Sequence, residues 1–407
     1  MVGAGAAGLA TAIFTARAAP GCRVVCVDTA RRIGAKILIS GGSRCNVTNR
    51  AVTEKDFWGG SSRFVRNVLR AFPDSRAVEF FSELGVALHE EEDGKLFPDS
   101  NSSRTVLNAL LAEAGRLGIS LVTGERVNTL TKDGDQFTAT TASGRIFLAR
   151  TAAICTGGRS LPKTGSDGFG YELARRLGHG GVSTVPALAP LVFDGWEELA
   201  GVTHPAGLTL RVGGRAETRL EGSLLWTHFG ASGPLPLNMS RHWHRADEHG
   251  HQCDLTINVC PGETFATLDE WFRGQEQSRP RAQVVTVVSS RLPNAVAERW
   301  VASAGVPREL TMAHLTREHR HALVRTLQET PLPVRGSRGF AYAEVTAGGV
   351  PLDEVDPATM ESRACANLFF TGEILDVDGR LGGFNFQWAW SSARVAARAI
   401  ARVLAAP

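Results

Sequence analysis

Three glycines and one acidic residue near the start of the chain have the spacing of a dinucleotide site. Gly3, Gly5 and Gly8 form the pattern G-x-G-x-x-G, and Asp28 follows the last glycine by 20 residues. In such a site the glycines allow a tight turn and a close approach of the backbone to a pyrophosphate, and the acid binds ribose hydroxyls. We place Ala7 with them in the cofactor contact. The alternative is a plain turn with an exposed strand end, and the pattern does not distinguish one dinucleotide from another.

Two later stretches carry similar signals. "AAICTGGRS" is an apolar strand that ends in Thr156 and Gly157, where the backbone could pass a bound nucleotide or simply turn. "LFFTGEILDVDGRLGGFNFQWAW" leads from a strand to Glu373 and Asp378 and then to a double glycine before a helix. A helix start of this kind stabilises negative charge, such as that of a reduced flavin.

The segment "GAKILISGGSRCNVTNR" is too polar to belong to a core. Lys36, Arg44 and Asn46 supply donors for phosphate, ribityl or flavin-ring oxygens, although a solvated loop would explain any one of them. Cys45 lies in the same segment without a second cysteine within a few residues. We therefore interpret it as a packing or flavin-adjacent thiol and not as a catalytic one.

Three histidines gather in "WTHFGASGPLPLNMSRHWHR", namely His228, His242 and His244. Their spacing lacks supporting acids or cysteines, so no metal site is predicted. His228 could line a substrate pocket, or it could be an ordinary half-buried histidine. No catalytic acid or base can be named from the sequence.

These residues need a scaffold of alternating helices and strands. Residues 6–19 have the small and apolar spacing of a buried helix, and residues 22–28 read as a buried parallel strand. Helices are expected over 75–85 and 103–118, each beginning at a serine that could cap it. Strand patterns then continue to residue 158, and the last helix is expected over 385–404.

The order of elements predicts an α/β fold. We expect a Rossmann-like cofactor domain built from both ends of the chain, residues 1–188 and 336–407. Residues 189–335 are expected to form an inserted substrate or cap domain, β-rich at first and then helical.

Composition restricts the partners. The 407 residues carry a formal charge of +3, with 44 basic and 41 acidic residues, which gives little support to nucleic-acid binding. We expect no membrane span, no signal peptide and a cytoplasmic location. The seven scattered cysteines favour reduced thiols, and nothing indicates an oligomeric state.

The glycine motif begins at the third residue, so the strand that usually leads into it is missing. We expect a natural chain with roughly 5–12 further apolar residues at the start, a typical strand length.

Taken together, "GAGAAGLATA", "KILISGGSRCNVTN", "ICTGGRSLPKTGSDGFG", "WTHFGASGPLPLNMSR" and "TGEILDVDGRLGGFNFQWAWSS" resemble one bacterial flavoprotein family nearly end to end. It is the family of the YhiN and BaiN proteins, often labelled aminoacetone-oxidase-like. The resemblance implies FAD as the cofactor. One departure is Ser43, which stands where the family usually has a third consecutive glycine.

The resemblance also implies roles for single residues. Gly3, Gly5 and Gly8 would hold the pyrophosphate and Asp28 the adenosine ribose, while Val127 would meet the adenine through its backbone. Further cofactor contacts are implied for Thr156, Gly157, Lys36, Cys45, Asn46, Glu373, Asp378, Gly383, Phe384 and Asn385.

We therefore predict an FAD-dependent oxidoreductase that transfers hydride between flavin N5 and a small organic substrate. It is either an NAD(P)H-dependent reductase of an activated double bond or an amine-type oxidase. No second G-x-G-x-x-G is present, so any NAD(P)H is expected to dock transiently. The alternatives are an RNA-modifying flavoprotein of the GidA type and an FAD-binding sensor without turnover.

Overall fold

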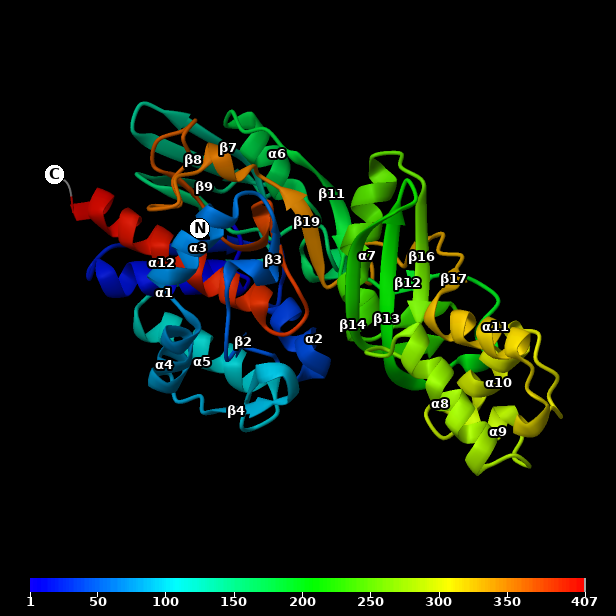
Figure 1. Cartoon of the computed structure of the whole chain (residues 1–407). Coiled ribbons are helices and arrows are strands. Elements are labelled where there is room, and N and C mark those ends of the chain that lie inside the picture. Colours follow the sequence, from blue (N-terminus) through cyan, green and yellow to red (C-terminus); the bar gives the residue numbers. More distant parts are fainter. Residues whose placement is uncertain (406–407) are drawn as a thin grey trace. The chain divides into compact units, whose positions relative to one another are not determined.

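The computed structural model describes residues 1–405, which divide into two compact units. The first unit consists of Met1–Ala187 together with the chain from Phe340 onward, and the second of Leu188–Gly339 (Figure 1). The boundaries expected from the sequence lie within a few residues of these divisions. Among the described residues, no helix is long and apolar enough to cross a membrane.

A parallel sheet forms the centre of the first unit. β1 (Val25–Asp28) pairs with β6 (Ser120–Thr123), and β10 (Ala152–Ile154) pairs with β20 (Leu368–Phe370), each in parallel. The first three residues of the chain join the two pairs.

Val2 forms parallel bridges to Val27 on one side and to Ile154 on the other. The backbone N–H of Val2 donates to the carbonyl of Ala153 at 2.8 Å, and that of Gly3 donates to the carbonyl of Val27 at 2.8 Å. Residues from both ends of the chain therefore share one sheet, and the predicted Rossmann-like α/β fold is confirmed.

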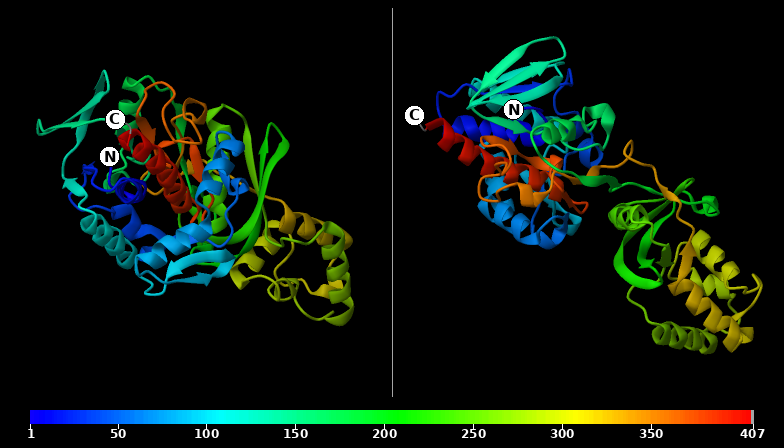
Figure 2. Two further views of the ribbon diagram at one scale, coloured as in Figure 1. Left: turned by 90° about the vertical axis from the view of Figure 1, so that its left-hand side faces the viewer. Right: turned by 90° about the horizontal axis from the view of Figure 1, so that it is seen from above.

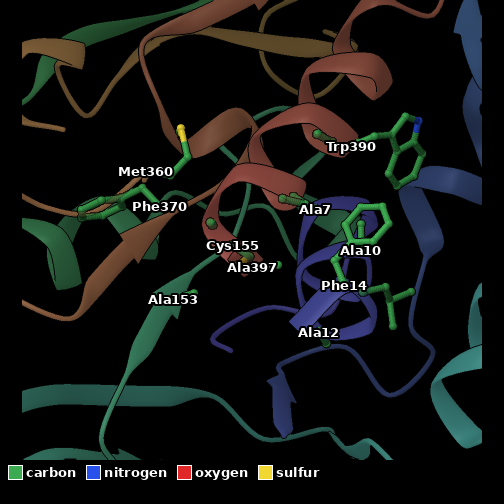
Figure 3. Packing of buried hydrophobic residues seen from close by; sticks show 14 of the residues in the cluster. Ala7, Ala10, Ala12, Phe14, Ala153, Cys155, Met360, Phe370, Trp390 and Ala397 are labelled. Carbon is green, nitrogen blue, oxygen red and sulfur yellow. The ribbon is translucent and has the colours of Figure 1, made fainter. Parts of the chain in front are cut away.

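Helices α1 (Ala6–Ala18) and α12 (Phe384–Ala405) lie side by side against this sheet (Figures 1 and 2). Small side chains let them approach closely. Ala10 of α1 and Ala397 of α12 are fully buried, and Cys155 packs beside them at the end of β10 (Figure 3). The alanine-rich sequences of both helices thus serve a helix-to-helix contact.

The remaining elements of the first unit surround this core. A three-stranded sheet β2-β5-β4, a second one β7-β8-β9 and the two-stranded pairs β11-β19 and β21-β3 are all antiparallel. The bounds are α2 (Ala35–Ser43), β2 (Thr48–Asn49), β3 (Phe57–Gly59), α3 (Ser62–Ala71), α4 (Asp74–Glu83), β4 (Leu88–Glu91), β5 (Lys95–Pro98), α5 (Ser103–Arg116), β7 (Val127–Asp133), β8 (Gln136–Thr141), β9 (Ile146–Ala149), α6 (Phe169–Arg176), β11 (Val182–Ala187), β19 (Val345–Gly349) and β21 (Val377–Gly379).

The second unit has its own core, built on a seven-stranded sheet of order β17-β16-β13-β14-β15-β12-β18. Its helices α8 to α11 follow one another in the chain and appear in yellow tones in Figure 2. The bounds are β12 (Leu191–Val192), β13 (Thr203–Val212), β14 (Arg215–Thr227), β15 (Gly230–Ser232), α7 (Pro234–Glu248), β16 (Cys253–Asn258), α8 (Phe265–Ser278), α9 (Val284–Val288), α10 (Asn294–Ser303), α11 (Arg317–Gln328), β17 (Thr330–Leu332) and β18 (Gly336–Ser337).

The helices expected over 75–85 and 103–118 exist, but the predicted serine caps are wrong. The residue before α4 is Pro73, and Ser75 lies inside the helix. Ser103 is the first residue of α5, and its hydroxyl donates to the carbonyl of Leu38 at 2.9 Å. The side chain therefore joins α5 to α2 and leaves the helix end uncapped.

A buried histidine makes the second unit sensitive to acid. His204 Nε2 accepts a hydrogen bond from Trp226 Nε1 at 2.9 Å, and His204 Nδ1 donates to the carbonyl of Pro205 at 2.8 Å. Both ring nitrogens are thus used by the neutral imidazole. Desolvation lowers the pKa of His204, although the bond to Pro205 opposes this shift.

Stability should therefore fall on acidification. The unfolded histidine takes up a proton near pH 6.5, while the folded one resists protonation, so stabilisation present above that pH is lost as the pH falls toward the lowered pKa. Tryptophan fluorescence during unfolding should report it, since Trp226 stacks on Trp196 with ring centroids 5.4 Å apart. The exposed His228 provides a control: His228→Gln should keep the acid sensitivity, and His204→Gln should reduce it. Equal acid sensitivity in the two variants would contradict this.

Candidate functional site

The glycine loop at the start of α1 combines two structural glycines with one that faces open space. Gly3 has φ +97°, and a Cβ there would lie 2.6 Å from the carbonyl oxygen of Cys155. A Cβ on Gly8 would lie 2.1 Å from the carbonyl oxygen of Gly3. A Cβ on Gly5, which directly precedes α1, would meet nothing within 4 Å. Ala7 is buried, and its Cβ would lie 2.6 Å from a Cβ on Gly372. The free space at Gly5 therefore lies where the backbone N–H groups of a helix start can bind an anion.

Hydrogen bonds accepted by Asp28 connect this loop to the end of β1. Its Oδ2 accepts from the backbone N–H of Ala4 at 2.6 Å, and its Oδ1 accepts from that of Ala30 at 2.7 Å. Each carboxylate oxygen keeps further acceptor capacity, which suits hydroxyl groups of a ribose.

Several of the predicted residues line one pocket beside the loop. The pocket brings Gly3, Asp28, Val127 and Thr156 together, and Gly157 follows Thr156 with φ +72°. The remaining lining residues are Val2, Val27, Thr29, Glu125, Arg126, Gly165, Asp167, Phe169, Gly170 and Leu173. Its wall is mostly small, apolar and acidic, and its one arginine, Arg126, is paired with Asp167 at 2.7 Å. Such a lining suits an adenosine.

Lys36 and Glu373 meet although 337 residues separate them. Lys36 Nζ lies 2.6 Å from Glu373 Oε2 and donates to Ser160 Oγ at 2.6 Å. Glu373 Oε1 accepts from Ser160 Oγ at 2.7 Å and from the backbone N–H of Thr346 at 2.9 Å. Ser160 and Glu373 follow β10 and β20, so the network lies at the carboxyl edge of the parallel sheet, where open α/β sheets bind ligands.

Sequence reasoning did not identify Ser160 or Thr346 in this network. Ser160 ends the stretch "AAICTGGRS", and Thr346 lies in the strand pattern near residue 345. A single hydroxyl in such a stretch carries no signal of its own, since Ser and Thr are common next to turns.

Asn46 has a buried oxygen without a partner. Asn46 is 8% exposed, and its Oδ1 accepts no hydrogen bond. A Cβ on Gly383 would lie 2.8 Å from this oxygen and 2.5 Å from the carbonyl of Thr48. An unpaired buried acceptor costs folding free energy, so a ligand that donates a hydrogen bond to Oδ1 of Asn46 would remove this cost.

The residue before Asn46 is a buried thiol. Desolvation raises the pKa of Cys45 to about 12, although a hydrogen bond with Ser40 opposes the rise. The thiol is therefore protonated at neutral pH, which makes it a poor nucleophile. Arg44 pairs with Glu91 and lies 4.1 Å over the ring of Phe97.

The start of α12 is held by its own side chains. Asn385 exchanges two hydrogen bonds with the backbone of Gly379, at 2.8 and 2.9 Å. Phe384 is fully buried against Phe57, and Asp378 is 1% exposed within β21. The side chains of Phe384 and Asn385 thus shape the turn that leads into α12.

Ser43 adopts a conformation that favours glycine. Gly41, Gly42 and Ser43 have φ values of +55°, +67° and +68°. A left-handed conformation costs an L-residue about 1–2 kcal/mol, and glycine avoids this cost. Glycine also loses more conformational entropy on folding, which offsets part of the gain, so Ser43→Gly should stabilise the protein by roughly 0.5–1 kcal/mol. Thermal unfolding of the apoprotein measures it. Ser40→Gly is the control and should destabilise the protein. Ser40 has φ −66°, where glycine relieves no strain, and the change removes a hydroxyl that donates to the carbonyl of Ile37 at 2.8 Å. A lower melting temperature for Ser43→Gly would contradict the argument.

His228 and His244 of the second unit lie in different surroundings. His228 is exposed in the turn between β14 and β15, and His244 Nε2 lies 2.7 Å from Ser337 Oγ. Among the described residues, no group of three or more His, Cys, Asp or Glu side chains could hold a metal ion.

A family model described as "HI0933-like protein Rossmann domain" matches residues 1–399. The chain belongs to this HI0933-like family. Its similarity to the YhiN and BaiN proteins is thereby confirmed, and it is an FAD-dependent oxidoreductase.

Curated relatives match along nearly their whole length. A "Ribosomal RNA dihydrouridine synthase" of Escherichia coli is 32% identical over 97% of this chain and 95% of the relative. A "3-dehydro-bile acid delta(4,6)-reductase" of Clostridium scindens is 32% identical over 98% of each chain. A Haemophilus influenzae relative with the first of these names is 31% identical over 99% of this chain and 98% of the relative.

Solved structures share the fold at low identity. The quinol fumarate reductase of Escherichia coli is 16% identical, with a TM-score of 0.50 over 100% of this chain and 70% of that chain. The 3-ketosteroid delta1-dehydrogenase of Sterolibacterium denitrificans is 12% identical, with a TM-score of 0.50 over 98% of each chain.

Proposed function

We propose that the protein reduces a carbon–carbon double bond conjugated to a carbonyl group, with NAD(P)H as the source of electrons and a small organic compound as substrate. The observation that carries this proposal is the chemistry common to the differently named relatives. Dihydrouridine is a uridine whose ring double bond, conjugated to a carbonyl, has been saturated. A 3-dehydro-delta(4,6) bile acid has double bonds conjugated to its 3-keto group. These two relatives, each 32% identical to this chain, thus share the type of bond named by their reactions, although their substrates differ.

The first unit would hold FAD, and its residues fit that group. The space at Gly5 accepts a pyrophosphate, the pocket at Asp28 and Val127 accepts an adenosine, and the unpaired Oδ1 of Asn46 accepts a donor of the flavin side. The further contacts proposed are those of Gly3, Ala7, Gly8, Lys36, Cys45, Thr156, Gly157, Glu373, Asp378, Gly383, Phe384 and Asn385. Bound FAD would supply a hydride at N5.

The residues of the chain would position and shield this chemistry. The start of α12 would stabilise negative charge on the cofactor through its backbone N–H groups. The ion pair of Lys36 and Glu373 would fix the carboxyl edge of the sheet next to it, because Ser160 and Thr346 hold the same carboxylate. The second unit would provide the substrate or cap domain.

A second candidate applies the same chemistry to RNA. Two relatives are named for ribosomal RNA, which supports a uracil base as substrate in spite of the balanced charge of this chain. An RNA substrate requires contacts to phosphates, so its binding should weaken steeply with salt.

One experiment with the FAD-loaded protein separates these functions. NADH, NADPH or, in a parallel sample, an amine donor is added without oxygen, and bleaching of the flavin absorbance is followed. The reduced protein is then mixed with 2-cyclohexen-1-one, 4-androstene-3,17-dione, an unmodified ribosomal RNA transcript or oxygen. We expect bleaching by one nicotinamide and rapid reoxidation by a conjugated ketone.

Each other result has a distinct meaning. Rapid reoxidation by the RNA alone, lost at high salt, would establish the second candidate. Fast reoxidation by oxygen alone, with reduction by an amine donor, would establish an oxidase. A flavin that neither nicotinamide nor an amine can bleach would indicate a sensor and refute the proposal.

A further inference from the structure

The hydroxyl group of Tyr171 is a buried donor without a partner. Tyr171 is the third residue of α6, and the residue as a whole is half-buried. Its hydroxyl oxygen, however, is buried and has no hydrogen-bond partner among the described residues. Most buried hydroxyl groups are hydrogen-bonded, because one without a partner costs folding free energy. A ligand that accepts a hydrogen bond from Tyr171 would remove this cost.

Helix α6 brings Tyr171 next to the adenosine pocket. Gly170, the residue before it, lines that pocket together with Thr156. A Cβ on Gly170 would lie 1.9 Å from the hydroxyl oxygen of Thr156 and 3.0 Å from the side chain of Ile374. Ile374 directly follows Glu373. The first turn of α6 therefore contacts both the end of β10 and the segment that carries Glu373.

The hydroxyl end of Tyr171 lies near the network of Lys36 and Glu373. A Cβ on Gly158 would lie 2.9 Å from the hydroxyl oxygen of Tyr171 and 2.4 Å from that of Thr346. The backbone N–H of Thr346 donates to Glu373, and the charge of Glu373 acts on the phenol of Tyr171. The side chain of Tyr171 thus extends from the adenosine pocket toward this network.

The surroundings of Tyr171 keep its phenol protonated. Desolvation of the hydroxyl group is the main cause that raises the pKa of Tyr171. The negative charges of Glu373 and Asp376 raise this pKa further, whereas the positive charge of Arg159 opposes them. The phenol is therefore a hydrogen-bond donor at neutral pH, and it requires an acceptor.

We propose that the hydroxyl group of Tyr171 donates a hydrogen bond to an oxygen of the pyrophosphate or the ribityl chain of FAD. This assignment rests on the cofactor proposed above. The pyrophosphate and the ribityl chain connect the adenosine to the flavin, and both are rich in acceptor oxygens. In the proposed arrangement they would run from the adenosine pocket toward Lys36 and Glu373, past the hydroxyl of Tyr171. Tyr171 would then be a cofactor contact that no sequence pattern identified.

The variant Tyr171→Phe tests this assignment, because it removes the hydroxyl group alone. In the apoprotein the melting temperature should stay unchanged or rise, since an unpartnered buried group is removed. Affinity for FAD, measured by fluorescence titration, should fall about 5- to 100-fold, the range for a lost hydrogen bond to a neutral or a charged acceptor. With FAD present, the melting temperature should therefore fall below that of the wild type. A hydroxyl with a purely structural role would instead lower the melting temperature of both forms.

The second tyrosine of the chain provides a matched control. Tyr342 is 50% exposed, and Tyr342→Phe should bind FAD within about twofold of the wild type. Titration with ADP then locates the acceptor, because ADP has a pyrophosphate and no ribityl chain. If Tyr171→Phe weakens ADP and FAD equally, the acceptor is a phosphate oxygen. If only FAD is weakened, the acceptor belongs to the ribityl chain.

Other results would contradict the assignment. Equal FAD affinity of Tyr171→Phe and the wild type would overturn it, and a slower reoxidation by 2-cyclohexen-1-one in that case would place the hydroxyl at the substrate. A lower melting temperature of the Tyr171→Phe apoprotein would also overturn it, because the hydroxyl would then have a partner in the protein. A wild-type apoprotein that binds no FAD would refute the proposed function itself. The melting temperatures of the two apoproteins would then decide separately whether the hydroxyl is unpartnered.

Discussion

Gly5→Ala is expected to remove most FAD binding while leaving the melting temperature of the apoprotein unchanged. The backbone at Gly5 has φ −72°, which alanine adopts without strain, and the added Cβ meets no protein atom within 4 Å. The methyl group would instead occupy the space proposed for the pyrophosphate. Losing even one or two hydrogen bonds to a charged group, at about 1.5–3 kcal/mol each, weakens affinity roughly 100-fold. Fluorescence titration of the apoprotein with FAD measures this.

Gly8→Ala is the matched control for this prediction, because it changes the same loop with a different consequence. Its Cβ would lie 2.1 Å from the carbonyl oxygen of Gly3, so the loop and α1 must separate. This variant should lose stability in the apoprotein as well as affinity. If Gly5→Ala lowered the melting temperature as much as Gly8→Ala, the second glycine would have a structural role and the proposed pyrophosphate position would be wrong.

The parts of the fold that could be predicted are those in which the signal is local. The helix from Ala6, the strand that ends at Asp28 and the last helix each show in a short run of residue types, and all three are present. The pocket likewise joins Gly3 and Asp28, which the motif had already paired. Local patterns succeed here because the backbone geometry of a turn restricts the residues that can occupy it.

Other contacts depend on the tertiary fold and left no such signal. Ser103 resembles a cap in sequence, yet its hydroxyl binds the carbonyl of Leu38 on a neighbouring helix. Lys36 and Glu373 were both proposed as cofactor residues, but their direct pairing across the sheet edge could not be read from either stretch.

Lys36→Met should destabilise the apoprotein, and adding Glu373→Gln should restore most of the loss. The two side chains are only 27% and 17% exposed, so removing the cation leaves a half-buried carboxylate that keeps two uncharged donors, Ser160 and the backbone of Thr346. Breaking a fully buried pair costs about 3–5 kcal/mol, and partial exposure reduces this to roughly 1–3 kcal/mol. A neutral amide at position 373 removes the uncompensated charge. Denaturant unfolding of the two single variants and the double variant gives the coupling energy.

The exposed pair of Arg50 and Glu90 provides the comparison, with side chains 72% and 41% accessible. Arg50→Met should change stability little, because solvent screens such pairs. If the effects of Lys36→Met and Glu373→Gln were simply additive, the pair would not act as a unit. The coupling energy thus tests whether Lys36 and Glu373 stabilise the sheet edge as a pair, without any cofactor or substrate present.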